Sequence, residues 1–123
     1  MQFRPSPQEV VALFERVAPS GPDVTRRRMF GFPAAFVNGN LCCGTFNDQL
    51  MLRLPDDARA ELEALGGLPF APMPGRPMKG YVAVGPHLFP DESVLHGWLE
   101  RAATFTRTLP PKTQAGRTRP PDA

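Results

Sequence analysis

The sequence has little cysteine. Its 123 residues include only two, Cys42 and Cys43, and these are adjacent. Neighbouring residues of a strand point to opposite faces, so this pair cannot form a disulfide framework or the spaced thiolates of a zinc site. We therefore expect both thiols to be reduced and structural.

Long apolar runs are also absent. No stretch approaches the roughly 18 apolar residues of a membrane span, and the N-terminal MQFRPSPQEVV lacks the apolar core of a secretory signal. We therefore expect a cytoplasmic location without membrane contact. The formal net charge of +2 is too small to indicate a polyanionic partner by itself.

The common catalytic signatures are missing as well. The sequence contains no GxSxG, P-loop, HExxH or dinucleotide-binding GxGxxG motif. Neither His87 nor His96 has a cysteine or second histidine at ligand spacing. We expect no enzymatic activity, no cofactor and no metal site.

Three segments carry apolar residues at helical spacing. The first helix is expected to begin at Ser6, which forms a capping box with Glu9. A short helix is expected over 56–65, before Gly66 and Gly67. The last helix is expected over 91–106, and the residues on its apolar side are Val94, Trp98, Ala102 and Phe105.

Two-residue turn signals, Asn38-Gly39 and Asn47-Asp48, separate three short runs of strand-forming residues. A fourth run follows a loop rich in proline and glycine. The expected strands span residues 34–37, 40–46, 49–54 and 81–84.

Two-residue loops fix an expected antiparallel register. Phe36 then pairs with Leu41, and Cys43 pairs with Ala34 and Leu52. One face, the expected core, collects Ala34, Phe36, Leu41, Cys43, Thr45, Leu50, Leu52 and Leu54. The second face collects Ala35, Val37, Asn40, Cys42, Gly44, Phe46, Gln49, Met51 and Arg53.

The order α-β-β-β-α-β-α predicts a two-layer α+β domain over residues 1–107, with an antiparallel sheet and helices mainly on one face. The second sheet face is half apolar, so we expect it to bind a protein partner or a second copy of the chain. The expected partner-binding residues are Val37, Phe46, Met51 and Arg53. Residues 108–123 are expected to form a disordered, basic, proline-rich tail.

Alternate residues of an extended segment point in opposite directions, so Arg26, Arg27 and Arg28 favour a solvated start of the sheet. Three alternative sites nevertheless remain open. The first is weak nucleic-acid binding by these arginines and the basic tail. Arg76 and Lys79 could instead bind a small anion together with Arg53. A reactive Cys42 beside Arg53 is the third alternative, because a guanidinium lowers a thiol pKa.

Several short motifs resemble one known family. They are Arg28-Met29-Phe30-Gly31, Phe36-Val37-Asn38-Gly39, Leu50-Met51-Leu52-Arg53, Gly75-Arg76-Pro77-Met78 and Trp98. In order and spacing they resemble the N-terminal domain of the TfoX/Sxy family, named for bacterial competence regulators, and the resemblance covers residues 25–107.

This resemblance implies a small α+β domain similar to the secretion-chaperone-like fold, a link to transcription and competence regulation, and no established enzymatic activity. Phe32 stands where the family often has a second glycine. The chain resembles a stand-alone version of the domain, because it ends before the helical C-terminal domain of full-length competence regulators.

Overall fold

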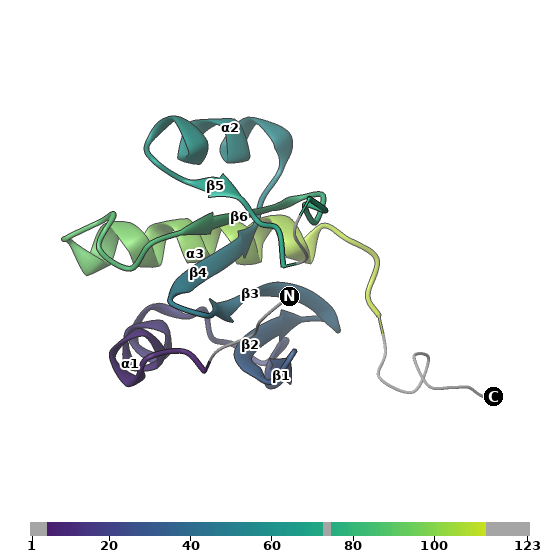
Figure 1. The fold of residues 1–123 in the computed structure, drawn as a ribbon. Helices are drawn as coiled ribbons and strands as arrows, with labels where there is room; N and C mark the ends of the chain where they lie inside the picture. Colours follow the sequence, from purple (N-terminus) through teal and green to yellow (C-terminus); the bar gives the residue numbers. More distant parts are fainter. Residues whose placement is uncertain (1–4, 73–74, 113–123) are drawn as a thin grey trace.

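Six strands form one sheet in the order β1-β2-β3-β4-β6-β5, and every neighbouring pair is antiparallel (Figure 1). The computed structural model describes residues 5–72 and 75–112. The predicted α+β class and element order are confirmed, and β1 and the short β5 are additional strands. The strands are β1 (Val24–Met29), β2 (Phe32–Val37), β3 (Asn40–Phe46), β4 (Gln49–Arg53), β5 (Leu68–Pro69) and β6 (Tyr81–Val84).

The three helices of the described chain, α1 (Gln8–Val17), α2 (Asp56–Ala64) and α3 (Glu92–Arg107), pack on one face of the sheet. Figure 1 shows α3 along the middle of the sheet, with α1 towards β1 and β2 and α2 beside β5. Their apolar side chains and the helix-facing strand residues form one core. Each large buried side chain contributes about 1.5–3 kcal/mol, and the helix residues among them include Val10, Phe14, Leu62, Leu95, Trp98 and Leu99.

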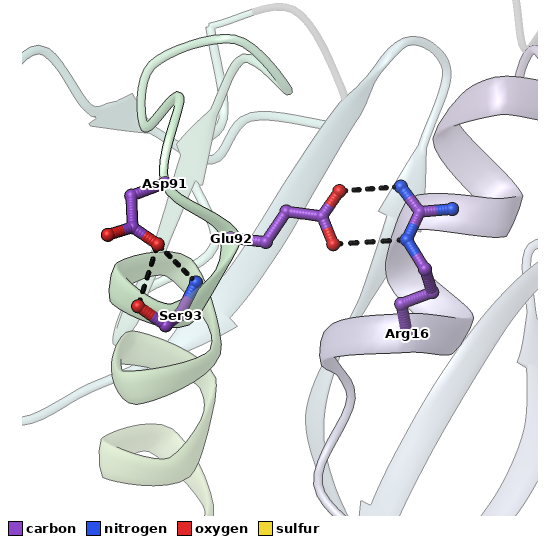
Figure 2. A network of polar contacts seen from close by, with 4 residues as sticks. All are labelled: Arg16, Asp91, Glu92 and Ser93. Atoms are coloured by element: carbon purple, nitrogen blue, oxygen red, sulfur yellow. Dashed lines mark hydrogen bonds and ion pairs between the residues drawn. The ribbon is translucent and has the colours of Figure 1, made fainter.

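Two local predictions about the helices are wrong. The Ser6 hydroxyl donates to Thr45 Oγ1 at 2.9 Å, and no side-chain hydrogen bond caps α1. In α3, Val94 is 46% exposed and Leu95 is buried, so the apolar side of the helix is rotated by one residue at its start. At the start of α3, by contrast, a side chain does cap the helix: the Asp91 carboxylate accepts hydrogen bonds from the backbone N–H and the hydroxyl of Ser93 (Figure 2).

The register between β2 and β3 contains a β-bulge. Phe36 pairs with Leu41 as predicted, but Ala35 pairs with Cys43, which leaves Cys42 as an extra residue in β3. The predicted pairing of Ala34 with Cys43 is therefore wrong. Beyond the bulge, the predicted pairing of Cys43 with Leu52 is confirmed.

The bulge changes which side chains face the helices. Ala35 and Val37 are buried in the helix-side core, whereas Leu41 packs on the opposite side of the sheet. The predicted position of Val37 on the second face is therefore wrong. Cys42 is also wrongly placed by the prediction, because as the bulged residue it joins Cys43 in the helix-side core.

Long-range polar contacts fasten both ends of α3. Arg16 of α1 makes two hydrogen bonds to Glu92, at 3.0 and 2.7 Å (Figure 2). At the other end, Arg107 donates to both carboxylate oxygens of Asp23, at 2.7 and 3.2 Å. These contacts connect α3 to α1 and to the residue that precedes β1.

The segment after α3 runs along the β2–β3 turn. The backbone N–H of Lys112 donates to the Asn38 carbonyl at 2.7 Å, and Asn40 Nδ2 donates to the Pro110 carbonyl at 2.9 Å. Residues 108–112 of the predicted tail are thus bonded to the domain. Residues 113–123 lie outside the described residues, so disorder there stays a prediction.

Gly44 allows β2 and β3 to approach closely. A Cβ at this position would lie 2.7 Å from the Pro33 carbonyl oxygen and 3.0 Å from Ala34 Cα. We expect Gly44→Ala to lower the free energy of unfolding by about 1–3 kcal/mol in urea titrations. Gly97→Ala is the matched control, since its Cβ meets nothing within 4 Å among the described residues. This helical change should stabilise by about 1 kcal/mol, and equal effects of the two changes would contradict the close approach.

The Asp23–Arg107 contact predicts a pH dependence of stability. Its hydrogen bonds lower the pKa of Asp23 below the ordinary value of 3.8. The contribution is therefore complete above the unfolded-state pKa and is lost as the pH falls through the lower folded-state pKa. We expect the stability difference between the unchanged protein and Asp23→Asn to be constant above about pH 5 and to shrink below about pH 4. Urea unfolding from pH 3 to pH 7 measures this, and a difference that grows on acidification would contradict it.

Candidate functional site

The candidate site is the sheet face opposite the helices, called here the helix-free face. Residues that pair directly share a face, so the register defines which side chains lie on it. One row joins Thr25 and Phe36 to Leu41, whose carbonyl accepts hydrogen bonds from Arg53 and Tyr81. The next row consists of Arg27, Ala34, Gly44, Met51, Ala83 and Leu68.

The centre of the helix-free face is covered by the segment that contains Phe70 and Met78. The Met78 N–H donates to the Phe70 carbonyl at 2.7 Å, and the Phe70 ring packs edge-on against Phe46, with centroids 5.1 Å apart. Phe46 and Met51 do face this side, as predicted, but they are only 5% and 0% exposed. The predicted open face is therefore open only around this covered centre.

Accessible apolar side chains surround that centre. Phe36 and Leu41 are half-buried, while Phe30 and Leu68 are 50% and 58% exposed. Phe30 lies in the β1–β2 turn, where its ring packs edge-on against Phe46. These four residues, none of which is among the predicted partner-binding residues, form what we call the apolar rim. The signal that was missed is the bulge, which turns Leu41 to this face.

Two arginines lie over aromatic rings at the apolar rim. The Arg27 guanidinium is 4.5 Å from the centroid of Phe36, and that of Arg53 is 5.3 Å from Tyr81. Arg53 Nη1 also donates to the Leu41 carbonyl at 3.3 Å. Burial raises the pKa of Tyr81, although the charge of Arg53 opposes this change. The ring contacts and this hydrogen bond hold both cations on the helix-free face.

The arginine run is divided between the two faces, as predicted. Arg26 binds Glu15 of α1 and lies over the Phe14 ring on the helix side. Arg27 lies on the helix-free face, and Arg28 donates to the Gly31 carbonyl. A groove of ≈ 320 Å³ beside this run follows the sheet edge. All three arginines line this groove together with Glu15, whose carboxylate binds Arg26, so phosphate binding by the run stays a prediction.

The three predicted anion-binding residues are not joined by contacts. Arg76 and Lys79 are exposed in the segment that covers the face, and Arg53 is half-buried at the rim. Among the described residues, no hydrogen bond or ion pair links Arg53 to the other two. Anion binding by this set stays a prediction.

The two cysteines lie side by side in the bulge, and both are fully buried. Their mutual hydrogen bond and burial raise the pKa of Cys43. The same hydrogen bond lowers the pKa of Cys42 and burial opposes this, while the charges of Arg107 and Arg53 add a smaller lowering in the predicted direction. The Thr106 hydroxyl, beside Cys42, donates its proton to the Ala102 carbonyl at 2.7 Å, so it cannot also stabilise a thiolate. The arrangement suits packing better than nucleophilic chemistry.

The histidines and acids offer no metal site in the part of the chain that the structure describes. Within residues 5–72 and 75–112, no three side chains of His, Cys, Asp or Glu gather closely enough to hold an ion. The His96 Nδ1 atom lies 2.8 Å from the Val17 carbonyl and donates to the end of α1. Nor does any described helix combine the length and apolarity that a bilayer span needs.

Burial of the thiols predicts slow alkylation. In the native protein we expect iodoacetamide to modify Cys42 and Cys43 at least roughly 100-fold more slowly than in concentrated urea, because reagent reaches them only when the core opens. Mass spectrometry after timed quenching measures both rates. Fast modification of Cys42 in the native protein would instead support the reactive thiol.

Comparison with known proteins agrees with the sequence motifs. No curated protein matches the chain. The TfoX N-terminal domain family matches residues 15–106, from α1 to the last turn of α3, and therefore includes the whole helix-free face. This is a family of regulatory rather than catalytic domains. The chain therefore belongs to the TfoX N-terminal domain family.

Proposed function

We propose that this chain is a non-enzymatic regulatory domain that acts by binding a protein partner through the apolar rim of its helix-free face. Its effect on transcription or on competence genes would then depend on the protein that it binds. Of the four predicted partner-binding residues, Arg53 lies at the rim. Phe46 and Met51 are buried in the cluster against which Leu41 packs, and Val37 is buried in the helix-side core.

The observation that carries this proposal is the position of exposed apolar side chains. Helices cover the other sheet face, so the strand residues that remain accessible gather on this one. Phe30 and Leu68 lie on opposite sides of the covered centre, with Phe36 and Leu41 between β1 and β4. Exposed apolar side chains gathered on one face are typical of protein-binding sites.

Nucleic-acid binding has weaker support. Arg26 is already bound to Glu15, and Arg27 lies on the other face of the sheet. Stacking of bases also requires accessible aromatic faces. Phe36 and Tyr81 have guanidinium groups over their rings, so these rings are poor platforms for bases.

Site-specific crosslinking tests the proposal. A photoreactive phenylalanine derivative at position 30 or 68 should give discrete protein adducts in living cells. Positions 65 and 94 are the matched controls, because Leu65 and Val94 are 52% and 46% exposed apolar residues outside the helix-free face. We expect adducts at 30 and 68 in clear excess over 65 and 94. Equal yields at all four positions, or adducts at the control positions alone, would overturn the proposal.

A further inference from the structure

The charges of this domain are distributed unequally between its two faces. Each ion pair among the described residues includes a helix residue, as in Arg16–Glu92, Arg26–Glu15 and Arg101–Glu61. The strand residues that face the helix-free side include no aspartate or glutamate. Carboxylates of the chain therefore neutralise the helix side but not the cations of the rim.

Arg27 and Arg53 are the strand cations on that acid-free face. Neither forms an ion pair among the described residues, and Arg27 Nη1 is buried without a hydrogen-bond partner there. Both guanidinium groups are held over rings, so a ligand would find them already positioned. Planar guanidinium groups bind carboxylates through two parallel hydrogen bonds.

The spacing of the two cations suggests the shape of their ligand. Arg27 lies over Phe36 of β2, and Arg53 is on β4, beyond Leu41 of β3. Strands are about 4.8 Å apart, so two to three spacings give about 10–14 Å. In an extended peptide, residues i and i+4 are about 13 Å apart, and residues i, i+2 and i+4 point to the same side.

We propose that the rim binds an extended acidic segment of a partner protein in which two carboxylates, four residues apart, contact Arg27 and Arg53 and an apolar residue midway contacts Leu41. This inference rests on the proposed function and names the chemistry of the partner. The apolar contact supplies buried area, and the two charged contacts fix the register of the segment.

Charge complementarity favours this occupant over the other two. In a symmetric dimer through this face, the same acid-free patch of each copy would meet the other, so the strands of neither copy would supply a carboxylate to Arg27 or Arg53. Single-stranded nucleic acid needs several ring faces for successive bases, whereas guanidinium groups lie over Phe36 and Tyr81 and the exposed Phe30 offers a single ring. An acidic peptide supplies the missing carboxylates and can bind with the guanidinium groups still lying over the rings.

Labelled ten-residue peptides test the inference by fluorescence anisotropy at 50 and 150 mM NaCl. The probe has a Glu-Ser-Leu-Ser-Glu centre with Gly/Ser flanks, and the two control peptides carry Lys-Ser-Leu-Ser-Lys or adjacent glutamates. We expect the probe to bind at least about tenfold more tightly than the lysine peptide and measurably more tightly than the peptide with adjacent glutamates. A probe that binds no better than the lysine peptide would overturn the inference, as would a ten-nucleotide single strand that binds more tightly and displaces the probe.

Variants locate the contacts. Arg27→Gln and Arg53→Gln should each weaken probe binding by about threefold to tenfold. Arg101→Gln is the matched control, because Arg101 also lies over a ring, that of Trp98 at 4.3 Å, but on α3. The affinity of Arg101→Gln for the probe should stay within about twofold of that of the unchanged protein. A loss as large as that in the other two variants would overturn the inference. Both arginines are half-buried and lie on different strands, so Arg53→Gln still tests the inference if Arg27→Gln fails to fold.

The two proposals fail in different ways. Crosslinks at positions 30 and 68 without preference for the acidic peptide would overturn the acidic ligand but retain a partner-binding face. Crosslinks that do not distinguish 30 and 68 from 65 and 94 would overturn the face itself.

Discussion

One extra residue, Cys42, decides which side of the sheet the side chains of β2 and the start of β3 lie on. Because Cys42 has no partner in β2, Ala35 pairs with Cys43 while Phe36 pairs with Leu41. Without this bulge, strict alternation would place Phe36 and Leu41 on the same side as Cys43, under the helices. The bulge instead sends Ala35 and Val37 to the helix-side core and turns Phe36 and Leu41 outwards. Two of the four rim residues, Phe36 and Leu41, therefore face outwards because of a local irregularity.

The same irregularity organises the polar groups around it. A bulge disrupts the ladder of backbone hydrogen bonds, and the Leu41 carbonyl beside it accepts from Arg53 Nη1 at 3.3 Å and from the Tyr81 hydroxyl at 3.4 Å. These contacts hold a cation at the rim. In the next row, Ala83 and Met51 pack in one cluster with Phe70, whose segment covers the centre. The rim and its cover thus depend on the same few strands.

Much of the fold could be predicted from the sequence, because its signals are local. Asn38-Gly39 marked the β2–β3 turn, where both residues have positive φ, and the pairing of Cys43 with Leu52 followed from the next turn. The bulge could not be predicted, because two adjacent cysteines are equally compatible with either face. The role of Phe70 and Met78 was missed for a similar reason: they belong to a segment rich in proline and glycine, which shows no periodicity, although both pack on the sheet.

On the helix side of this domain, apolar and charged strand residues find partners within the chain, whereas on the helix-free face some remain accessible. On the helix side, apolar strand residues meet helices and arginines meet carboxylates, as Arg26 does with Glu15. On the other face, Leu68 is exposed and Arg27 and Arg53 contact rings rather than acids. Stability alone would favour covering the apolar groups and pairing the charges. A face that retains both accessible apolar groups and positioned cations is therefore better explained by a ligand that supplies apolar groups and carboxylates together.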